Sequence, residues 1–285
     1  MSGKYVHLNG QLVAAGQAAI SVSDAGFLHG ASSFTTMRAH NGVVFRLSAH
    51  LSRLLGTVET LGLRTDADAE SLTAAAGELL EANELLEARM RITLTPGPIS
   101  GGDPTVLITA DALPDYPAAW YSEGISVAIT ELRQSPGDIA CGRKTGCYFP
   151  RILAMRTAAA KQASEALWFT AEGHLAEGCF CNVFLRSGDE LLTPPLETPV
   201  LDGILRGAVI ELCEKLAIKC VCDRPLVGRD VLDADELFMT SSCSGIRPVV
   251  RVEDRTIADG KVGPISQELM AAYADVLEAE CPPRE

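Results

Sequence analysis

The stretch Gly142-Arg143-Lys144-Thr145-Gly146 places a lysine among small residues, and Tyr148 follows it closely. Further along, Glu177-Gly178-Cys179-Phe180-Cys181-Asn182 sets a carboxylate ahead of an apolar run. A lysine between glycines is approachable, and it becomes a nucleophile where burial or a neighbouring cation disfavours its protonated form. Most lysines are solvated surface charges. The function of Lys144 therefore has to be inferred together with the residues that follow it.

The size and composition of the chain are those of a soluble globular protein. Its 285 residues suffice for one large domain or two ordinary ones. Hydrophobic residues make up 47% and charged residues 21% of the chain, and no apolar run approaches the length of a membrane span. The first residues lack the apolar core of a secretory signal. The net charge of −13 argues against a nucleic-acid partner.

Nine cysteines, an odd number, are scattered through the chain. In the absence of a signal peptide, an odd count favours reduced thiols and a cytoplasmic location. The pairs Cys179-x-Cys181 and Cys220-x-Cys222 lack the two-residue spacing and the paired histidines of a zinc site. We therefore expect no bound metal.

The first part of the chain predicts two hairpins and two helices. Asn9-Gly10 and Asn41-Gly42 are hairpin turns, and residues 24–30 predict a loop. Ser48 is expected to cap an amphipathic helix. Its buried face would consist of Leu51, Leu54, Leu55, Val58 and Leu61. A second helix at about 68–86 would turn inward Leu72, Ala75, Ala76, Leu79, Leu80 and either Asn83 or Leu86. The strands are expected at 5–13, 33–39, 43–47, 89–95 and 105–110.

A linker-like segment rich in proline divides the chain. We predict an N-terminal α/β domain at 1–112, a linker at 113–122 and a second domain at 123–285. In the second domain, helices are expected at 149–162, after Asp202 as the cap, and at 265–277. Its strands are expected at 125–130, 166–170, 182–186, 190–193, 236–240 and 246–252.

Three features of the chain could bind an anion. Asp202-Gly203 opens a helix, whose free backbone N–H groups and dipole attract negative charge. Thr240-Ser241-Ser242-Cys243-Ser244-Gly245 follows a strand with hydroxyls and small side chains. Arg53 lies on the first long helix. Alternatively these are a capped helix, a solvated loop and a surface charge. A phosphorylated cofactor that reacts with a lysine would employ all of them.

Taken in order, the motifs of this chain resemble those of the fold-type IV, or class IV, pyridoxal-phosphate enzymes. This family includes branched-chain aminotransferases, D-amino-acid aminotransferases and aminodeoxychorismate lyases. The resemblance is carried by Phe45 through Leu54, the Lys144 stretch with Tyr148, Leu175 through Phe184, Thr193 through Leu196, Leu201 through Arg206, and Phe238 through Ser242. It covers nearly the whole chain. It implies a two-domain α/β (α+β) fold with pyridoxal 5'-phosphate at the domain interface, in a homodimer.

The resemblance assigns roles to individual residues. Lys144 would be the Schiff-base lysine and the proton shuttle. Glu177 would pair with the pyridine nitrogen, so that the ring acts as an electron sink, and Arg53 would bind the phosphate. The remaining cofactor contacts would be the backbone N–H groups of Ile204 and Leu205, the turn residues Ser242 and Cys243, Leu201 on a ring face, and Tyr148 near the ring hydroxyl. Leu205, Cys179, Cys181 and Ser242 depart from the commoner pattern, but none of them removes an essential group.

The substrate side contains conflicting signals. Phe34-Thr35-Thr36 resembles a run in the aminodeoxychorismate lyases, and Thr36 would be the pocket hydroxyl that the lyase uses. By strand alternation, Phe34, Thr36 and Arg38 point the same way. Arg91 occupies a strand that supplies a carboxylate-binding cation in several members. His29 stands where the branched-chain enzymes usually have a tyrosine.

The loop after Thr95-Pro96-Gly97 favours an aminotransferase over a lyase. It lacks the arginine that is common in lyases and D-amino-acid aminotransferases. Arg38 and Arg91 could hold a substrate carboxylate, or they could pair with surface carboxylates. We therefore predict an aminotransferase that moves an amino group between an amino acid and a 2-keto acid. The alternative is an aminodeoxychorismate lyase. A scaffold that has lost the cofactor would leave Lys144 and Glu177 without a role.

Overall fold

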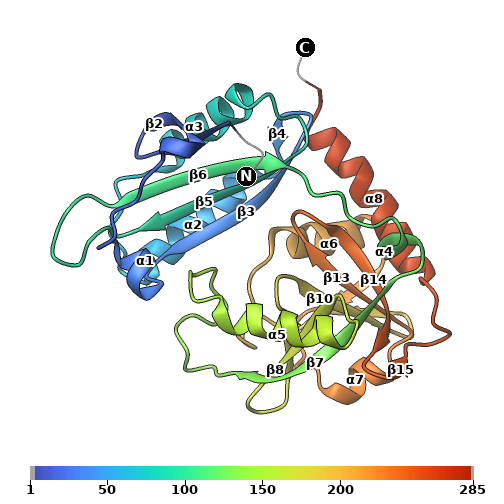
Figure 1. Ribbon diagram of the computed structural model, residues 1–285. Helices are drawn as coiled ribbons and strands as arrows, with labels where there is room; N and C mark the ends of the chain where they lie inside the picture. Colours follow the sequence, from blue (N-terminus) through green and yellow to red (C-terminus); the bar gives the residue numbers. More distant parts are fainter. Residues whose placement is uncertain (1–3, 284–285) are drawn as a thin grey trace. The chain divides into compact units, whose positions relative to one another are not determined.

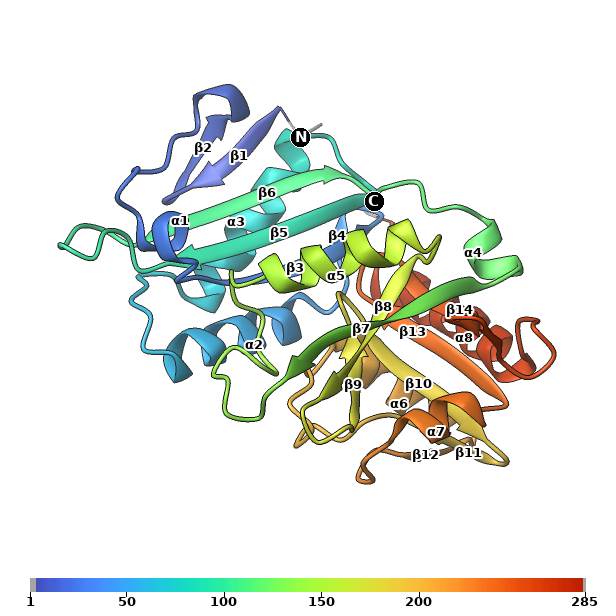
Figure 2. The same cartoon turned by 60° about the horizontal axis from the view of Figure 1, so that its bottom comes forward.

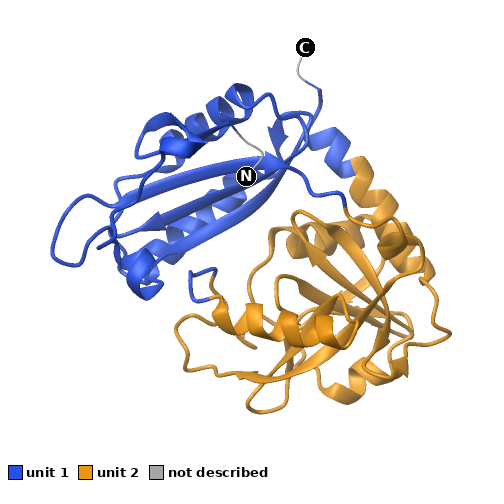
Figure 3. Ribbon diagram, in the orientation of Figure 1, with its two compact units in different colours: residues 1–115, 144–147, 276–285 blue, residues 116–143, 148–275 orange. Residues whose placement is uncertain are grey.

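The computed structural model describes residues 4–283, which form two compact units (Figure 3). Within the described residues, unit 1 comprises 4–115, Lys144–Cys147 and 276–283, and unit 2 comprises Tyr116–Arg143 and Tyr148–Asp275. The short segment that carries Lys144 thus belongs to unit 1, although its neighbours in sequence belong to unit 2. Each unit is built around its own β-sheet.

Unit 1 is an antiparallel sheet covered by helices. Within the described residues the sheet has six strands in the order β2-β1-β6-β5-β3-β4. They are β1 (Tyr5–Leu8), β2 (Gln11–Ala14), β3 (Ser33–His40), β4 (Val43–Val44), β5 (Ala88–Thr95) and β6 (Thr105–Ala112). Its helices are the 3₁₀ turn η1 (Ala15–Gln17), α1 (Ala25–His29), α2 (Leu47–Thr60) and α3 (Ala69–Ala82). Helices α2 and α3 run along one face of the sheet (Figures 1 and 2).

The alternation along β3 decides which side chains face the helices of unit 1. Thr35, Met37 and Ala39 are fully buried, and Met37 and Ala39 belong to the core with α2 and α3. Phe34, Thr36 and Arg38 therefore share the opposite face, as strand geometry requires and as the sequence predicted. The inward face of α3 is also confirmed, with Asn83 buried and Leu86 65% exposed.

Two local predictions in unit 1 were wrong. Residues 24–30 are not a loop, because Asp24 accepts hydrogen bonds from the N–H groups of Gly26 and Phe27 and so caps α1. The helix predicted to begin after Ser48 begins at Leu47, and its N-cap is Arg46 in the left-handed conformation, with φ of 49°. The strand expected at 43–47 is correspondingly short, because the chain turns at Arg46.

Unit 2 is a mixed sheet. Within the described residues nine strands pair in the order β12-β11-β10-β13-β14-β7-β8-β9, with β15 beside β14. They are β7 (Ile125–Gln134), β8 (Glu165–Thr170), β9 (Leu175–Gly178), β10 (Asn182–Ser187), β11 (Glu190–Leu192), β12 (Lys219–Val221), β13 (Glu236–Ser241), β14 (Gly245–Val252) and β15 (Arg255–Thr256). Strand β7 is parallel to both β8 and β14. Ile125, Val127, Ala128 and Thr130 of this strand are buried, whereas Glu131 and Arg133 near its end are exposed.

The helices of unit 2 are α4 (Ala119–Ser122), α5 (Phe149–Ala160), α6 (Ile204–Lys215), α7 (Gly228–Leu232) and most of α8 (Pro264–Glu280). Helix α5 packs through Ala154 and Ala158 against Trp168 of β8. Helix α6 begins after Gly203, which is its N-cap and offers no side-chain hydrogen bond. The prediction that Asp202 caps this helix was therefore wrong. Among the described residues, no helix has the length and apolarity needed to span a membrane.

Candidate functional site

Backbone hydrogen bonds hold the Lys144 segment against β3 within unit 1. The carbonyl of Lys144 accepts from the N–H of Phe34 at 2.9 Å, and the N–H of Gly146 donates to the carbonyl of Ser32 at 2.9 Å. A Cβ on Gly146 would lie 2.3 Å from Oγ of Ser32. Glycine is thus required here because the segment approaches the strand so closely. The lysine backbone is fixed, so its side chain starts from a defined position.

The side chain of Lys144 shares an aromatic ring with an arginine. Nζ of Lys144 lies 5.0 Å from the centre of the Phe34 ring, and Cζ of Arg91 lies 3.5 Å from it. Nε of Arg91 also donates to Oγ1 of Thr93 at 3.0 Å. Phe34 is buried, while Lys144 and Arg91 are half-buried. Two of the predicted cations are therefore held over one apolar side chain by cation–π contacts.

Arg53 is joined to the same unit by a buried histidine and a hydroxyl. Its NH2 group donates to Oγ1 of Thr35 at 3.2 Å, and that hydroxyl lies 2.8 Å from Nδ1 of His50. Burial first, and then the positive charges of Arg53 and Lys144, lower the pKa of His50 to about 3. Both cations therefore act in the same direction on one imidazole. The imidazole is neutral at physiological pH.

The predicted substrate residues of unit 1 lie in different environments. Thr36 is half-buried and is the cross-strand partner of Arg91. Arg38 lies on the same face, but its NH2 group forms an ion pair with Glu87 at 3.1 Å. His29 is exposed at the end of α1. The structure thus groups Phe34, Thr36 and Arg91 with Lys144, and it gives Arg38 a carboxylate partner.

In unit 2, Glu177 is a buried carboxylate with three donors. Its Oε1 accepts from NH2 of Arg151 at 2.5 Å and from Nε2 of Gln134 at 3.0 Å. Its Oε2 accepts from the N–H of Leu201 at 3.0 Å. Glu177 is 3% exposed. Burial disfavours the charge of Arg151, but the Glu177 carboxylate outweighs it and raises the pKa of Arg151. The pair is therefore an ion pair with fixed geometry.

The predicted ring contacts of unit 2 surround this ion pair. Tyr148 stacks on Phe180 with ring centres 5.7 Å apart, and Cζ of Arg151 lies 5.4 Å from the Tyr148 ring. The carbonyl of Leu201 accepts from Nδ2 of Asn182 at 2.8 Å. Tyr148 thus reaches Glu177 through Arg151, and Leu201 reaches it through its own backbone N–H.

The start of α6 leaves backbone donors for an anion. Ile204 and Leu205 form the first turn of the helix, where N–H groups have no helical acceptor. A Cβ on Gly203 would lie 1.9 Å from Oδ1 of Asn182, so only glycine fits this approach. The positive end of the helix dipole adds to the attraction. The arrangement suits a phosphate group.

The turn between β13 and β14 contains Ser242 and Cys243. The hydroxyls of Ser241 and Ser244 lie 2.7 Å apart and close the turn. Just before it, Oγ1 of Thr240 is buried and has no hydrogen-bond partner among the described residues. A buried hydroxyl without a partner is costly. It is chemically suited to a ligand that carries acceptor oxygens.

The residues that the sequence analysis missed support the predicted ones. Arg151 and Gln134 contact Glu177, and Thr35 and His50 contact Arg53 or its hydrogen-bond partner. Two of these four residues had a detectable signal. His50 lies one turn from Arg53 on α2, and Arg151 lies one turn after Tyr148 at the start of α5. Gln134 had no such signal, because it reaches Glu177 only through the pairing of β7 with β8 and of β8 with β9.

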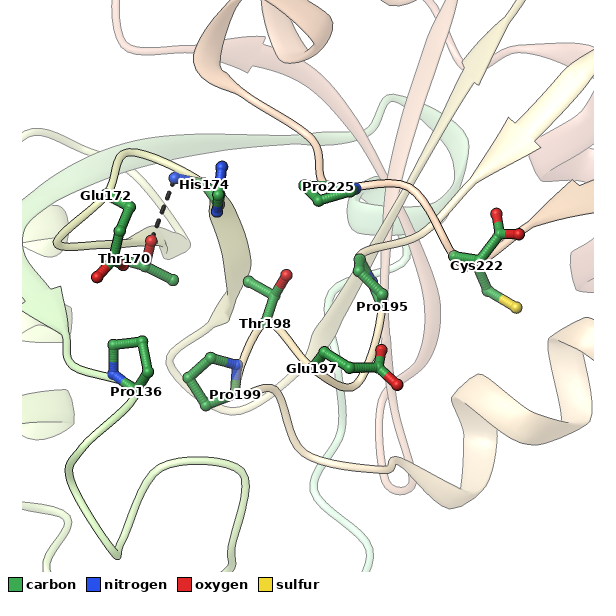
Figure 4. Close-up of a pocket in the computed structure, with 11 residues that line it drawn as sticks. Pro136, Thr170, Glu172, His174, Pro195, Glu197, Thr198, Pro199, Cys222 and Pro225 are labelled. Atoms are coloured by element: carbon green, nitrogen blue, oxygen red, sulfur yellow. Dashed lines mark hydrogen bonds between the residues drawn. The ribbon is translucent and has the colours of Figure 1, made fainter.

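A surface pocket of about 600 Å³ lies elsewhere in unit 2 (Figure 4). Its lining includes Pro195, Pro199, Glu172 and His174, and the N–H of His174 donates to Oγ1 of Thr170 at 3.2 Å. None of the predicted site residues lines it. Among residues 4–283 no cluster of His, Cys, Asp and Glu has the composition of a metal site.

The amino-acid sequence is similar to that of known enzymes along most of its length. The family model described as amino-transferase class IV matches residues 32–252. The chain is 31% identical over 279 residues, 95% of this chain and 96% of the other, to a Methanocaldococcus jannaschii protein assigned as a branched-chain-amino-acid aminotransferase. It is 28% identical over 258 residues, 87% of each chain, to the aminodeoxychorismate lyase of Bacillus subtilis.

A solved structure shows the same fold. The branched-chain aminotransferase of the archaeon Thermoproteus uzoniensis, solved with norvaline, superposes with a TM-score of 0.90 at 28% identity. The superposition covers 98% of this chain and 96% of that chain.

Proposed function

Because the chain belongs to the class IV aminotransferase family, we propose that it binds pyridoxal 5'-phosphate and transfers an amino group between an amino acid and a 2-keto acid. The observation that carries the proposal is the environment of Glu177. A buried carboxylate, with its orientation fixed by three donors, is the group needed to keep a proton on a pyridine nitrogen.

The residues present fit this cofactor. The uncapped start of α6 supplies N–H donors for a phosphate dianion. Oγ1 of Thr240 and Nε2 of His50 are buried polar atoms without partners among the described residues. Glycine at position 203 leaves room for Asn182, because a side chain there would collide with the Asn182 amide. We propose that Arg53, Ile204, Leu205, Ser242 and Cys243 hold the phosphate.

Each residue of this site would then have its own role. Nζ of Lys144 would attach the cofactor and afterwards move the proton at the substrate Cα. Glu177 would hold the proton on the ring nitrogen, while Leu201 and Tyr148 would orient the ring. When bound, pyridoxal phosphate supplies an electron sink for the pair left behind as that proton departs.

Arg91 is the residue we propose for the substrate carboxylate. It lies on the same face as Thr36 and over the Phe34 ring that Lys144 also contacts. Its guanidinium geometry matches a carboxylate. Arg38 is a weaker candidate because Glu87 already occupies its NH2 group. His29 would lie at the rim.

A homodimer in the cytoplasm completes the proposal. The side chains of Val22, Phe27 and Ile99 in unit 1 are 80%, 73% and 76% exposed, and a second copy of the chain would cover such apolar groups. All nine cysteines are free thiols, which suits a reducing compartment. Size-exclusion chromatography with light scattering tests the dimer.

A half-reaction tests the reaction class. Adding a suitable D- or L-amino acid to the holoenzyme should convert the visible absorbance of the cofactor to that of the pyridoxamine form, and a 2-keto acid should restore it. The second candidate, an aminodeoxychorismate lyase, is favoured by the Phe34-Thr35-Thr36 run. It predicts pyruvate release from aminodeoxychorismate without any keto acid. Rapid pyruvate release and no amino-acid half-reaction would reject the aminotransferase.

A further inference from the structure

The carboxylate of Glu177 can accept more hydrogen bonds than residues 4–283 donate to it. A carboxylate offers about four lone-pair positions, two on each oxygen. Oε1 accepts from Arg151 and Gln134, and Oε2 accepts from the N–H of Leu201. With the donors of residues 4–283 counted, one position therefore remains, and it belongs to Oε2. A single N–H donor, such as a protonated ring nitrogen, would complete the set.

Arg151 is the positively charged donor to Glu177, and several contacts hold its own guanidinium in place. Its NH1 group donates to the carbonyls of Gly178 and Cys179, each at 2.9 Å, while NH2 reaches Glu177. The rings of Tyr148 and Trp168 lie 5.4 and 5.5 Å from its Cζ. Its side chain is 15% exposed. The guanidinium therefore cannot move away from Glu177 without losing several contacts.

The charge of Arg151 has a consequence for any ligand that Glu177 binds. A cation that is paired with a carboxylate in a poorly solvated site cancels part of the field that the carboxylate projects. The same cation disfavours a second positive charge nearby. On the basis of the proposed function, we infer that Arg151 acts through Glu177 to weaken the hold of the site on the proton of the pyridine nitrogen. Arg151 is thus a positioning residue that tunes the cofactor.

The test follows the ring nitrogen directly. Holoenzyme is prepared with ¹⁵N-labelled pyridoxal phosphate, and the ¹⁵N chemical shift is recorded against pH. Arg151→Gln keeps a donor but removes the charge, and it should raise the midpoint of the titration by about one pH unit. Arg151→Lys keeps the charge and should leave the midpoint near that of the wild type. Arg156→Gln, at an exposed position of the same helix, is the matched control and should also leave it unchanged.

Each outcome decides the inference. A midpoint that is raised in Arg151→Gln but not in Arg151→Lys or Arg156→Gln supports the inference. Equal midpoints in Arg151→Gln and wild type, or an equally raised one in Arg151→Lys, would overturn it. If Arg151→Gln does not fold, Arg151→Met, which also removes the charge, takes its place with the same expected rise. Borohydride reduction of the wild type distinguishes failure of this inference from failure of the proposed function. If Lys144 carries no label after reduction, the cofactor assignment itself is wrong.

Discussion

Oγ1 of Thr35 lies 2.8 Å from Nδ1 of His50, and both side chains are fully buried. The same hydroxyl accepts a hydrogen bond from Arg53. A neutral imidazole and a guanidinium are thus linked through one oxygen. Because α2 carries both His50 and Arg53 while β3 carries Thr35, the link fixes the helix to the strand at the point where Arg53 begins to extend.

Thr35→Val should weaken cofactor binding although Thr35 is not a predicted contact. The valine has the same shape but cannot accept from Arg53, so the guanidinium loses a charge-assisted hydrogen bond. We expect a loss of about 1 kcal/mol, or roughly fivefold in the dissociation constant. Titration of apoprotein with pyridoxal phosphate, followed by fluorescence quenching, measures it. Thr36→Val, one residue along on the opposite face, should leave this constant unchanged, and an equal effect of both would refute the assignment.

Arg53→Ala should have a larger effect on the same measurement. It removes a charge-assisted contact to a dianion, which costs about 1.5–3 kcal/mol. Arg89→Ala is the control, because Arg89 is exposed on β5 of the same unit. If both variants bind the cofactor as tightly as the wild type, Arg53 is only a structural residue.

His50 should make the folded state sensitive to acid. Burial is the main reason that the pKa of His50 falls to about 3 in the folded protein, whereas its ordinary value is 6.5. Between these two values the unfolded chain binds a proton that the folded chain rejects, so the free energy of unfolding falls as the pH falls from 6.5 toward 3. Urea unfolding at pH 7 and pH 5 should show a smaller decrease for His50→Gln than for the wild type. Identical decreases would mean that His50 is not excluded from protonation.

The two arginines of the substrate face should differ. Arg91→Ala should raise KM for the amino acid or keto acid at least tenfold, about 1.4 kcal/mol, because a bidentate carboxylate contact is lost. Arg38→Ala should change KM little, since Arg38 is already paired with Glu87. Steady-state kinetics under saturating cofactor measures both. The reverse order of effects would transfer the carboxylate role to Arg38.

Local patterns in the sequence predicted much of the fold. The period of α3 and the alternation of β3 identified their buried faces, because one hydrophobic face determines each element. Caps were harder to predict. Ser48 and Asp202 are chemically suitable, but Arg46 adopts a left-handed conformation and Gly203 is needed beside Asn182, and both facts depend on contacts distant in sequence.

Motifs in the sequence name Lys144 and Glu177 as candidate site residues, and their roles stay predictions. The site was not predictable where a residue acts through another. Gln134 reaches Glu177 only because β8 places the end of β7 near β9, and no local pattern encodes that sheet order. The segment Lys144–Cys147 belongs to unit 1 and is hydrogen-bonded to β3. The residues next to this segment in the sequence do not indicate that pairing.

Borohydride reduction of the holoenzyme, followed by peptide mapping, identifies the lysine that carries the cofactor. We expect a phosphopyridoxyl label on Lys144 and none in a Lys144→Ala variant. Lys161 is the natural competitor in the same part of the sequence, but it is paired with Glu253 at 3.0 Å. A label on Lys161, or a protein that retains no pyridoxal phosphate to reduce, would show that Lys144 is not the cofactor-binding lysine.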